Sequence, residues 1–419
     1  MIRNYLKIAV KVLLRRKFFT FISLFGISVT LLVLLVATAM IDHTIAPQAP
    51  ESRADRMLGF QKLRMQGPDS TWTSEPGYAF LDKHIRSLTA LPGVETVTVF
   101  SNNASASSYL AGRKITSSVK RTDGRFWQVF DFEFLEGQPF SVADEENGNF
   151  VAVISEATRE RFFGDQKAVG QSIEVDGQRF RVVGVVRNVP VIRNNSSADL
   201  WVPISTAKTS GYKDQVVMGN FNAMILARSR ADFPAIKSEV QARLRQAEKN
   251  LPDPKMYKTL AGGADTAFEA LSRSLLPGDF DQEPGARLQK VLFLALMLFL
   301  LLPTMNLVNI NLSRILDRAS EIGVRKAFGA SSRTLVGQFL VENLVLTLVG
   351  AGFGLLLAAL VLAALNSSGV IPYAHFTLNY RVFLQGLGIA LFFALLSGVY
   401  PAWRMSRLHP VKALRGRTV

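Results

Sequence analysis

Few side chains in this sequence have the types and spacing that enzymatic chemistry requires. The 419 residues include no cysteine, which excludes disulfides, thiolate metal sites, iron–sulfur clusters and a cysteine nucleophile. The sequence contains no H-E-x-x-H or G-x-S-x-G motif, and no phosphate-binding glycine-rich loop followed by Lys-Ser/Thr. We therefore expect no catalytic residue and no bound metal in this chain.

Three groups of polar residues between positions 42 and 290 remain as candidate ligand sites. His43 and His84 are too few for a metal cluster. The acidic run Asp144-Glu145-Glu146 could bind a cation, but a solvated loop between strands is the simpler interpretation. Seven arginines could line a site for an anionic ligand, although ordinary surface charge is again simpler. They are Arg121, Arg125, Arg159, Arg161, Arg179, Arg181 and Arg187.

The most distinctive polar segment is residues 314–333, which combines both signs of charge with helical spacing. One face of the predicted helix carries Asp317, Arg318, Glu321 and Arg325. Glu321 and Arg325 have the favourable i, i+4 order, and Gly329 supplies a helix stop. A helix lying on lipid would carry a face rich in Lys and Arg alone. The mixed charges favour a helix that is offered to a cytoplasmic protein.

Four uncharged runs around this segment are each long enough to cross a bilayer. A hydrocarbon core about 30 Å thick needs roughly 20 apolar residues. The runs are residues 18–41, 291–313, 343–365 and 382–403. The first is longer than the roughly 7–15 apolar residues of a cleaved signal peptide, so we interpret it as a retained anchor. We predict four membrane spans.

The positive charges lie in the segments that the rule of positive-inside loops places in the cytoplasm. Lys and Arg number six in residues 1–17, five in 314–342 and five in 404–419, but none in 366–380. The segment 42–290 is nearly neutral, with 31 basic and 30 acidic residues. This predicts cytoplasmic ends, a short external loop at 366–381 and a large periplasmic domain at 42–290, in a bacterial inner membrane. The net charge of +15 is then a topology signal and not a nucleic-acid footprint.

The external segment is predicted to be an α+β domain large enough for two small cores. Asp176-Gly177 between alternating apolar residues indicates a hairpin over 172–186. Further strands are expected at 94–100, 119–122, 150–154 and 222–227. Helices are expected at 80–91, 156–163 and 234–248.

Two cytoplasmic motifs resemble those of a known family. The run Glu321-Ile-Gly-Val-Arg-Lys-Ala-Phe-Gly-Ala-Ser331 resembles the signature after the second span of MacB/FtsX-like ABC transporter permeases. Pro401-Ala-Trp-Arg404 and the run 410–415 resemble the end of that family's fourth span and tail. Weaker pieces at 126–137, 151–164 and 180–186 resemble its periplasmic core domain.

The resemblance implies a permease dimer, of identical or paralogous chains, that is driven by a separate pair of ABC ATPase subunits holding ATP and magnesium. It implies that the helix 317–331 docks on the ATPase. The docking residues would be Asp317, Arg318, Glu321, Ile322, Gly323, Arg325, Lys326, Phe328 and Gly329. It also implies an external region of two lobes, 43–118 plus 216–285 and an inserted 119–215. MacB itself carries an ATPase in the same chain, whereas this sequence has no Walker A motif.

The family's functions leave two hypotheses open. We expect efflux of a substrate, with a periplasmic adaptor and an outer-membrane channel as further partners. The alternative is a signalling or regulatory module that controls a cell-wall hydrolase or senses a peptide. A membrane-anchored enzyme is not favoured, because catalytic motifs are missing.

The predicted spans themselves favour mechanical transmission of movement. No span carries a charge in its interior, which argues against an ion-driven carrier. Gly350 and Gly354 have the small-xxx-small spacing that lets helices pack closely. That packing could lie within one chain or form a dimer seam.

Overall fold

The computed structural model describes residues 7, 9, 11, 13–15, 17–110, 113–214, 216–251, 257–276, 278, 280, 283–317, 324 and 331–406. The chain divides into two compact units. Unit 1 contains Met1–Asp42, Lys290–Val370 and His375–Val419. Unit 2 contains His43–Gln289 and Ile371–Ala374.

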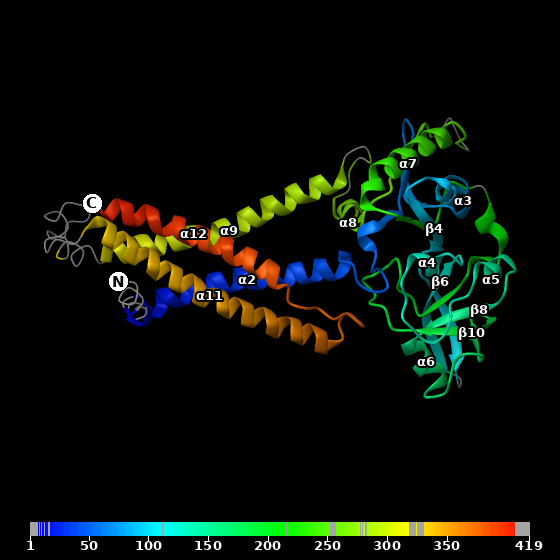
Figure 1. Cartoon of the computed structure of the whole chain (residues 1–419), viewed down its shortest axis with the longest axis horizontal. Coiled ribbons are helices and arrows are strands. Elements are labelled where there is room, and N and C mark those ends of the chain that lie inside the picture. Colours follow the sequence, from blue (N-terminus) through cyan, green and yellow to red (C-terminus); the bar gives the residue numbers. More distant parts are fainter. Residues whose placement is uncertain are drawn as a thin grey trace. The chain divides into compact units, whose positions relative to one another are not determined.

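Unit 1 is built from long helices that cover the four predicted spans and extend beyond each of them (Figure 1). The helices are α2 (Lys17–Ile45), α9 (Pro284–Asp317), α11 (Ser332–Ser368) and α12 (Tyr380–Ser406). Unit 2 includes the last residues of α2 and the first of α9. Within the described part of the chain, two helices are long and apolar enough to cross a membrane, namely α2 and residues Leu340–Ser368 of α11. The described apolar part of α12, Tyr380–Leu396, is shorter.

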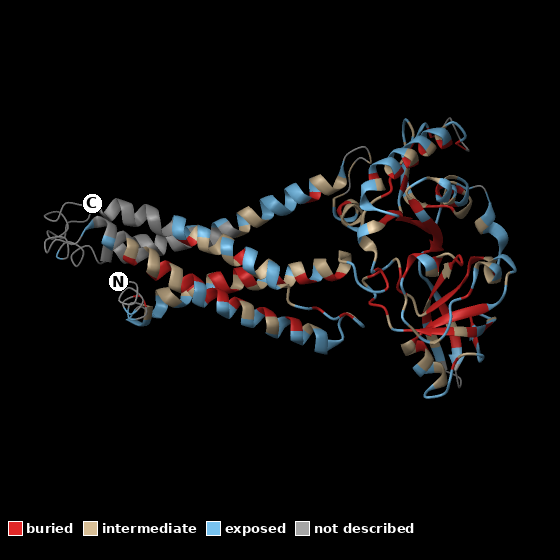
Figure 2. Ribbon diagram, in the orientation of Figure 1, coloured by how far each residue is buried: buried red, intermediate tan, exposed pale blue. Residues whose placement is uncertain are grey.

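The helices of unit 1 meet through a small apolar core and leave large apolar side chains outside it. Ile27 and Leu31 of α2 are buried with Leu346 and Ala351 of α11. Many large apolar side chains elsewhere on these helices are exposed, and exposed residues are drawn pale blue in Figure 2. They include Phe21, Phe25, Leu294, Leu360 and Leu384. Contiguous exposed apolar surface of this kind is typical of helices that face lipid or a partner.

Unit 2 is organised by one ten-stranded mixed sheet. Its main path runs β1-β13-β4-β6-β11-β8-β10-β7, with β5 beside β6 and β9 beside β10. Strand β6 pairs in parallel with β11, as β8 does with β10, and the other pairs are antiparallel. The strands are β1 (Met57–Phe60), β4 (Val94–Ser101), β5 (Ala104–Leu110), β6 (Arg113–Thr122), β7 (Phe134–Gly137), β8 (Val151–Ser155), β9 (Ser172–Val175), β10 (Gln178–Val186), β11 (Leu200–Pro203) and β13 (Phe221–Ala227).

A second, four-stranded antiparallel sheet and several helices complete unit 2. The small sheet has the order β12-β3-β2-β14. Its strands are β2 (Leu63–Gln66), β3 (Thr71–Pro76), β12 (Met218–Gly219) and β14 (Thr259–Gly262). The helices are α3 (Tyr78–His84), α4 (Phe126–Val129), α5 (Val142–Glu146), α6 (Glu156–Phe163), α7 (Phe233–Glu248) and α8 (Ala267–Leu275). Burial is concentrated in the large sheet, drawn red in Figure 2.

Most of the predicted local elements of unit 2 are confirmed. The hairpin turns at Asp176 and Gly177, both with positive φ, as a primed two-residue turn requires. Helix α6 ends before Gly164, also with positive φ. The helix expected over 80–91 is wrong in its second half, because α3 ends at His84 and a 3₁₀ helix covers Arg86–Ala90. Such tightening is common at helix ends, and Pro92 follows closely.

The predicted boundary between the two lobes falls inside a strand. The boundary was placed at 118/119, but β6 runs without a break across it. The large sheet therefore continues through both predicted lobes, while three buried clusters of apolar residues lie along it. The halves of unit 2 share one sheet, and one of the three clusters spans them, with Phe100 and Met224 from one half and Trp201 from the other.

Candidate coupling site

The two halves of the large sheet meet at a narrow crossing between β4 and β6. Their register contains the single pair Phe100↔Thr122. The Asp123 amide, directly after β6, donates to the Val99 carbonyl at 3.1 Å. Phe100 packs edge-to-face on the ring of Phe126 at a centroid distance of 5.6 Å. Backbone pairing here is sparse, so side chains must supply much of the connection.

The Asp123 carboxylate supplies that connection. It is 1% exposed and accepts hydrogen bonds from the Thr98 hydroxyl at 2.5 Å, the Val99 amide at 3.0 Å and the Phe126 amide at 3.1 Å. The Arg86 guanidinium completes the set at 3.1 Å. Burial raises the pKa of the Asp123 carboxyl, and the charge of Arg86 opposes that rise. A carboxylate with this many donors fixes one geometry between β4, β6 and α4.

Arg193 holds the C-terminal end of α2 inside unit 2. Its side chain is 1% exposed, and its Nη2 donates to the carbonyl oxygens of His43 at 2.9 Å and Ala46 at 3.0 Å. The Nη1 atom donates to Glu51 at 3.2 Å, and the Ser196 hydroxyl donates to the other Glu51 oxygen at 2.6 Å. Carbonyls at a helix C-terminus lack intrahelical partners and carry partial negative charge, which a cation satisfies. This Arg193–Glu51 cluster fastens α2 to the loop before β11.

Lys120 is a second buried cation of this neighbourhood. It lies on β6, is 1% exposed, and donates from Nζ to the Asn194 carbonyl at 2.8 Å. The Nζ atom also lies 5.2 Å from the centroid of the Phe100 ring. Burial lowers the pKa of Lys120 to about 7, against the opposing charge of Glu51. The loop that holds α2 is thus tied to the crossing strand of the sheet.

The segment that leads into α9 is also held by arginines. The guanidinium carbons of Arg64 and Arg273 lie over the ring of Phe280, at 5.0 and 4.5 Å from its centroid. Arg64 donates to the Gly278 carbonyl at 2.7 Å. Arg273 forms a two-bond ion pair with Asp265, at 2.6 and 3.2 Å. The Arg193–Glu51 cluster at the end of α2 is the first junction of unit 2 with a long helix. The contacts of Gly278 and Phe280 with Arg64 of β2 and Arg273 of α8 form the second junction, just before α9.

Helix α8 contributes one more bond to this second junction. The Ser272 hydroxyl donates to the carbonyl of Pro284, the first residue of α9, at 2.5 Å. The helix begins with a capping box, in which Thr266 and Glu269 bond each other's backbone amides. Lys237 of α7 pairs with Glu269 at 2.7 Å. Helix α8 is therefore held at its start while it holds the start of α9.

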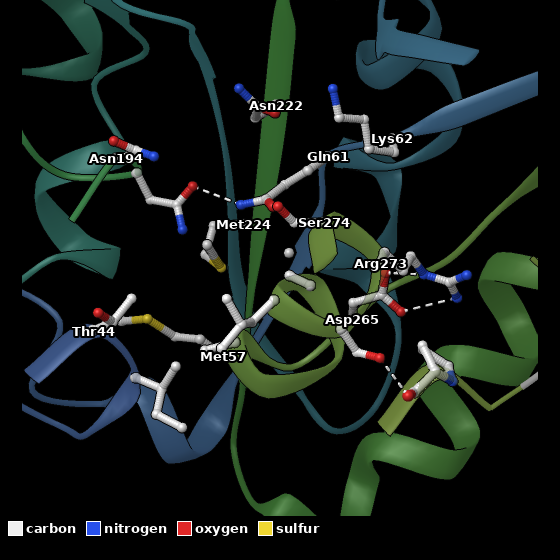
Figure 3. A pocket seen from close by; sticks show the side chains of 18 of the residues that line it. Thr44, Met57, Gln61, Lys62, Asn194, Asn222, Met224, Asp265, Arg273 and Ser274 are labelled. Carbon is white, nitrogen blue, oxygen red and sulfur yellow. Dashed lines mark hydrogen bonds and ion pairs between the residues drawn. The ribbon is translucent and has the colours of Figure 1, made fainter. Parts of the chain in front are cut away.

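A cavity of about 720 Å³ opens between the two junctions (Figure 3). Its lining includes Thr44 and Ile45 at the end of α2, and Pro284 and Arg287 at the start of α9. Ligand pockets usually measure about 300–1,000 Å³, so this cavity has the size of a binding site. The end of α2 and the start of α9 therefore both contribute to its wall.

The predicted docking helix falls almost wholly outside the described residues. Asp317 is the last residue of α9, and Ser331 caps the start of α11 by accepting from the Thr334 amide at 3.2 Å. The loop predicted over 314–342 is thus helical from Ser332 onward. The remaining docking residues, which lie outside the described part, are Arg318, Glu321, Ile322, Gly323, Arg325, Lys326, Phe328 and Gly329.

The two glycines singled out in α11 face α2 of the same chain. A Cβ atom on Gly350 would lie 3.0 Å from the Cβ of Ile27, and one on Gly354 would lie 3.0 Å from the Cβ of Leu31. The Ser28 hydroxyl donates to the Gly350 carbonyl at 2.9 Å. The small residues therefore make intrachain contacts, which was one of the two alternatives.

The other polar candidates have structural partners. Asp144 accepts from the Ser141 amide and hydroxyl at the start of the short helix α5, so the acidic run forms the last three residues of that helix and is not a loop. No group of three metal-ligating residues occurs among the described positions. His84 packs on Phe80, while His43 is buried at the end of α2. None of the seven arginines lines the cavity. They lie on β6 (Arg121), before α4 (Arg125), on α6 (Arg159 and Arg161), on β10 (Arg179 and Arg181) and directly after β10 (Arg187).

Comparison with known proteins decides the family. Residues 20–243, more than half of the chain, match the model of the MacB-like periplasmic core domain. Residues 293–410 match the model of the FtsX-like permease C-terminal region. The chain belongs to the MacB/FtsX-like family of ABC transporter permeases.

Relatives within this family are moderately similar. The pyoverdine export ATP-binding/permease protein PvdT of Pseudomonas fluorescens is 27% identical over 94% of this chain and 57% of its own length. The ABC transporter permease YknZ of Bacillus subtilis is 23% identical over 83% of both chains. The periplasmic region of MacB from Actinobacillus actinomycetemcomitans covers 54% of this chain and 94% of its own, with 13% identity and a TM-score of 0.38. The chain spans about half the length of the pyoverdine-export relatives.

Proposed function

We propose that this chain is a permease subunit that passes ATP-driven movement from cytoplasmic ATPases to its external domain, and that this movement extrudes a substrate. Its family membership supports the permease role. The observation that best supports transmission is the buried Arg193–Glu51 cluster, which joins the end of α2 to the interior of unit 2. Movement of α2 along its axis would act on that cluster directly.

The proposed topology has four spans in a bacterial inner membrane, formed by α2, α9, α11 and α12. Unit 2 lies in the periplasm, and both ends of the chain lie in the cytoplasm. The distribution of Lys and Arg supports this arrangement. So does the grouping of Ile371–Ala374, from the connection between α11 and α12, with the residues of unit 2.

The proposed energy source is a pair of ABC ATPase subunits. The 419 residues contain no Walker A motif, so we assign ATP and Mg²⁺ to ATPase domains outside them. We propose that residues 317–331 form the helix that docks on those domains, with Glu321 and Arg325 in the charged contact. A second permease chain, identical or paralogous, completes the dimer.

The proposed direction is export. One relative is named for pyoverdine export, and this supports extrusion without identifying the substrate. Substrate would be handled at unit 2, and a periplasmic adaptor with an outer-membrane channel would receive it. No charged residue lies inside the predicted spans, which supports movement of helices over a polar path through the bilayer.

Charge reversal in the docking helix tests this proposal. Glu321→Arg and Arg325→Glu would each weaken binding of the ATPase and reduce the stimulated ATP hydrolysis of the assembled complex. The double variant retains an i, i+4 pair, so the helix itself keeps its stabilisation. It should nevertheless stay uncoupled, since its charges no longer match the ATPase surface.

The exposed charge of Asp69 in unit 2 offers the matched control, because Asp69→Lys should leave hydrolysis unchanged. Recovery of ATPase binding in the double variant would show that the two charges support the helix and do not dock it. Normal ATPase binding in Glu321→Arg, in Arg325→Glu and in the double variant would contradict the docking assignment.

A further inference from the structure

The short connection between α11 and α12 is attached to the helix that precedes it. Asn366 lies in the last turn of α11, and its side-chain amide donates to the Phe376 carbonyl at 3.0 Å. The Asn366 side-chain oxygen in turn accepts from the Phe376 amide at 2.8 Å. Two bonds between one carboxamide and one backbone residue fix both the distance and the orientation of the pair. The connection is therefore held to the end of α11 at a second point along the chain.

The middle of the same connection belongs to unit 2. Residues 371–374 group with that unit, and Ala374 is buried. Burial raises the pKa of the Tyr373 hydroxyl, the negative charge of Asp199 adds to the rise, and the positive charge of Arg161 opposes it. Tyr373 also has a φ of 62°, in the left-handed region that residues other than glycine seldom adopt. Its surroundings therefore hold this part of the connection in one conformation.

Asn379 ends the connection and makes two kinds of contact with one side chain. Its Oδ1 atom accepts from the backbone amides of Arg381 and Val382, at 3.1 and 3.3 Å, which is the bonding of a helix N-cap. Its Nδ2 atom donates to the Asp42 carboxylate of α2 at 2.6 Å. The start of α12 is therefore fixed to α2 through a single carboxamide.

Asp42 stands where α2 passes from one unit to the other. It is the last residue of α2 in unit 1, and the next residue, His43, belongs to unit 2. The His43 carbonyl accepts from Arg193 at 2.9 Å, within the cluster that holds the end of α2. Asn379 and Arg193 therefore hold adjacent residues of the same helix.

We propose that Asn379 is a positioning residue for transmission, which makes the start of α12 and the end of α2 move together. A displacement of α12 then reaches Asp42 directly and the Arg193–Glu51 cluster through the next peptide bond. Unit 2 is thereby driven by α12 as well as by α2 and α9, which continue into it. The contact stands on its geometry, whereas its part in movement rests on the proposed function.

Exchange of the two side chains separates this role from helix capping. Asn379→Asp keeps a good N-cap, since Asp and Asn cap helices about equally well. It removes the donor to Asp42 and sets two carboxylates against each other, so the contact should open. In the exchanged pair, Asn379→Asp with Asp42→Asn, a carboxamide on α2 can donate to the carboxylate at the cap, and the bond returns with its direction reversed. Thr377→Asp is the matched control, because it adds the same charge at an exposed position of the connection.

Thermal unfolding of the full chain in detergent tests the contact. We expect the melting temperature to fall by a few degrees in Asn379→Asp, to recover in the exchanged pair and to stay unchanged in Thr377→Asp. If the exchanged pair does not recover, the bond to Asp42 does not join the two helices, and the proposal is overturned.

Labelling of unit 2 in the complex with its ABC ATPase tests the role. The chain has no cysteine, so Val191→Cys places a single thiol at an exposed position of unit 2, two residues before Arg193. We expect ATP to change the rate at which this thiol reacts with a maleimide several-fold in the parent and in the exchanged pair. In Asn379→Asp the change should be much smaller, although ATPase binding stays normal. A residue that only stabilises the fold would not alter this response to ATP.

A response to ATP in Asn379→Asp as large as in the parent would overturn the proposal. So would loss of the response in Thr377→Asp, because the added charge would then be the cause. No response in the parent would contradict the proposed function and with it the role of Asn379, while the thermal comparison would still report the contact. Docking is tested separately, since weakened ATPase binding is expected for the Glu321 and Arg325 variants alone.

Discussion

The two units of this protein hold themselves together by different means. Unit 2 buries charged side chains against partners of opposite charge, Arg193 against the buried Glu51 and Asp123 against the partly buried Arg86. Unit 1 brings α11 against α2 at Gly350 and Gly354, with one hydroxyl-to-carbonyl bond from Ser28. In one unit the defining contacts are electrostatic, and in the other they depend on the absence of a side chain.

The difference follows from what surrounds each unit. A water-exposed domain collapses through the hydrophobic effect, and buried charges then select one arrangement among several compact ones. Helices in lipid gain little from hiding apolar surface, so close backbone contact and weak hydrogen bonds decide their pairing. Substitutions should therefore destabilise the two units by different means. In unit 2 they leave a buried charge without a partner, and in unit 1 they create a steric clash.

The largest expected effect comes from Arg193→Leu. It strands the Glu51 carboxylate and the carbonyls at the end of α2, and loss of one partner of a buried pair costs about 3–5 kcal/mol. Urea unfolding in detergent, followed by tryptophan fluorescence, measures it, because Trp201 donates to the Ser196 carbonyl beside the cluster. The double variant Arg193→Leu/Glu51→Leu should recover part of the loss. If the double variant loses as much free energy of unfolding as the single variant, an unpaired Glu51 carboxylate is not the cause of the destabilisation.

Lys120 should give unit 2 a distinctive pH dependence. Burial lowers its pKa to about 7 in the folded chain, below the ~10.4 of an unfolded lysine. Between these values the unfolded chain binds more protons, so the free energy of unfolding rises with pH, by at most about 1.4 kcal/mol per pH unit. Lys120→Met removes this rise. Unfolding of both proteins at about pH 6 and about pH 9 tests it, and parallel pH profiles would contradict it.

In unit 1, Gly354→Val should destabilise the helix pair. Its added Cβ would meet Leu31 and the Ser28 carbonyl at 3.0 Å, and overpacking of this kind costs about 1–3 kcal/mol. Gly352→Val is the matched control, since no atom lies within 4 Å of a Cβ there. Thermal unfolding in detergent measures the stability of both variants. Equal damage from Gly352→Val would instead place a partner chain on that face.

The smallest effect is expected for Ser28→Ala. The bond to the Gly350 carbonyl crosses between helices, and such bonds contribute on average about 0.6 kcal/mol in membrane proteins. Thermal stability in the same detergent should fall slightly, and far less than for Arg193→Leu. A loss comparable to that variant would erase the contrast between the two units.

The sequence predicts local features of this fold well. Asp176-Gly177 specifies its hairpin, Gly164 ends α6, and the buried run of β8 precedes a helix with a serine cap, because each signal lies within a few residues. Strands without such signals were not predicted. Strand β5 is rich in Ala and Ser, while β1 and β11 are four-residue buried runs without alternation. Only pairing with distant strands makes them strands.

The candidate coupling site could not be predicted for a related reason. Arg193 lies among polar loop residues with no periodicity, and its partners His43, Ala46 and Glu51 lie about 150 positions earlier. Phe280 and Arg64 are equally remote in sequence. The small-residue spacing of α11, by contrast, is visible in five consecutive residues, although the helix that it faces is not.

The single registered pair between β4 and β6 has a consequence for how unit 2 can deform. Two neighbouring strands that are joined by many backbone hydrogen bonds resist bending between them, because all of these bonds would be strained at once. This one is narrow at Phe100 and Thr122, so twisting one half against the other strains few backbone bonds there. Resistance to such twisting then depends mainly on the Asp123 carboxylate, whose four donors hold β4, β6 and α4 in one arrangement.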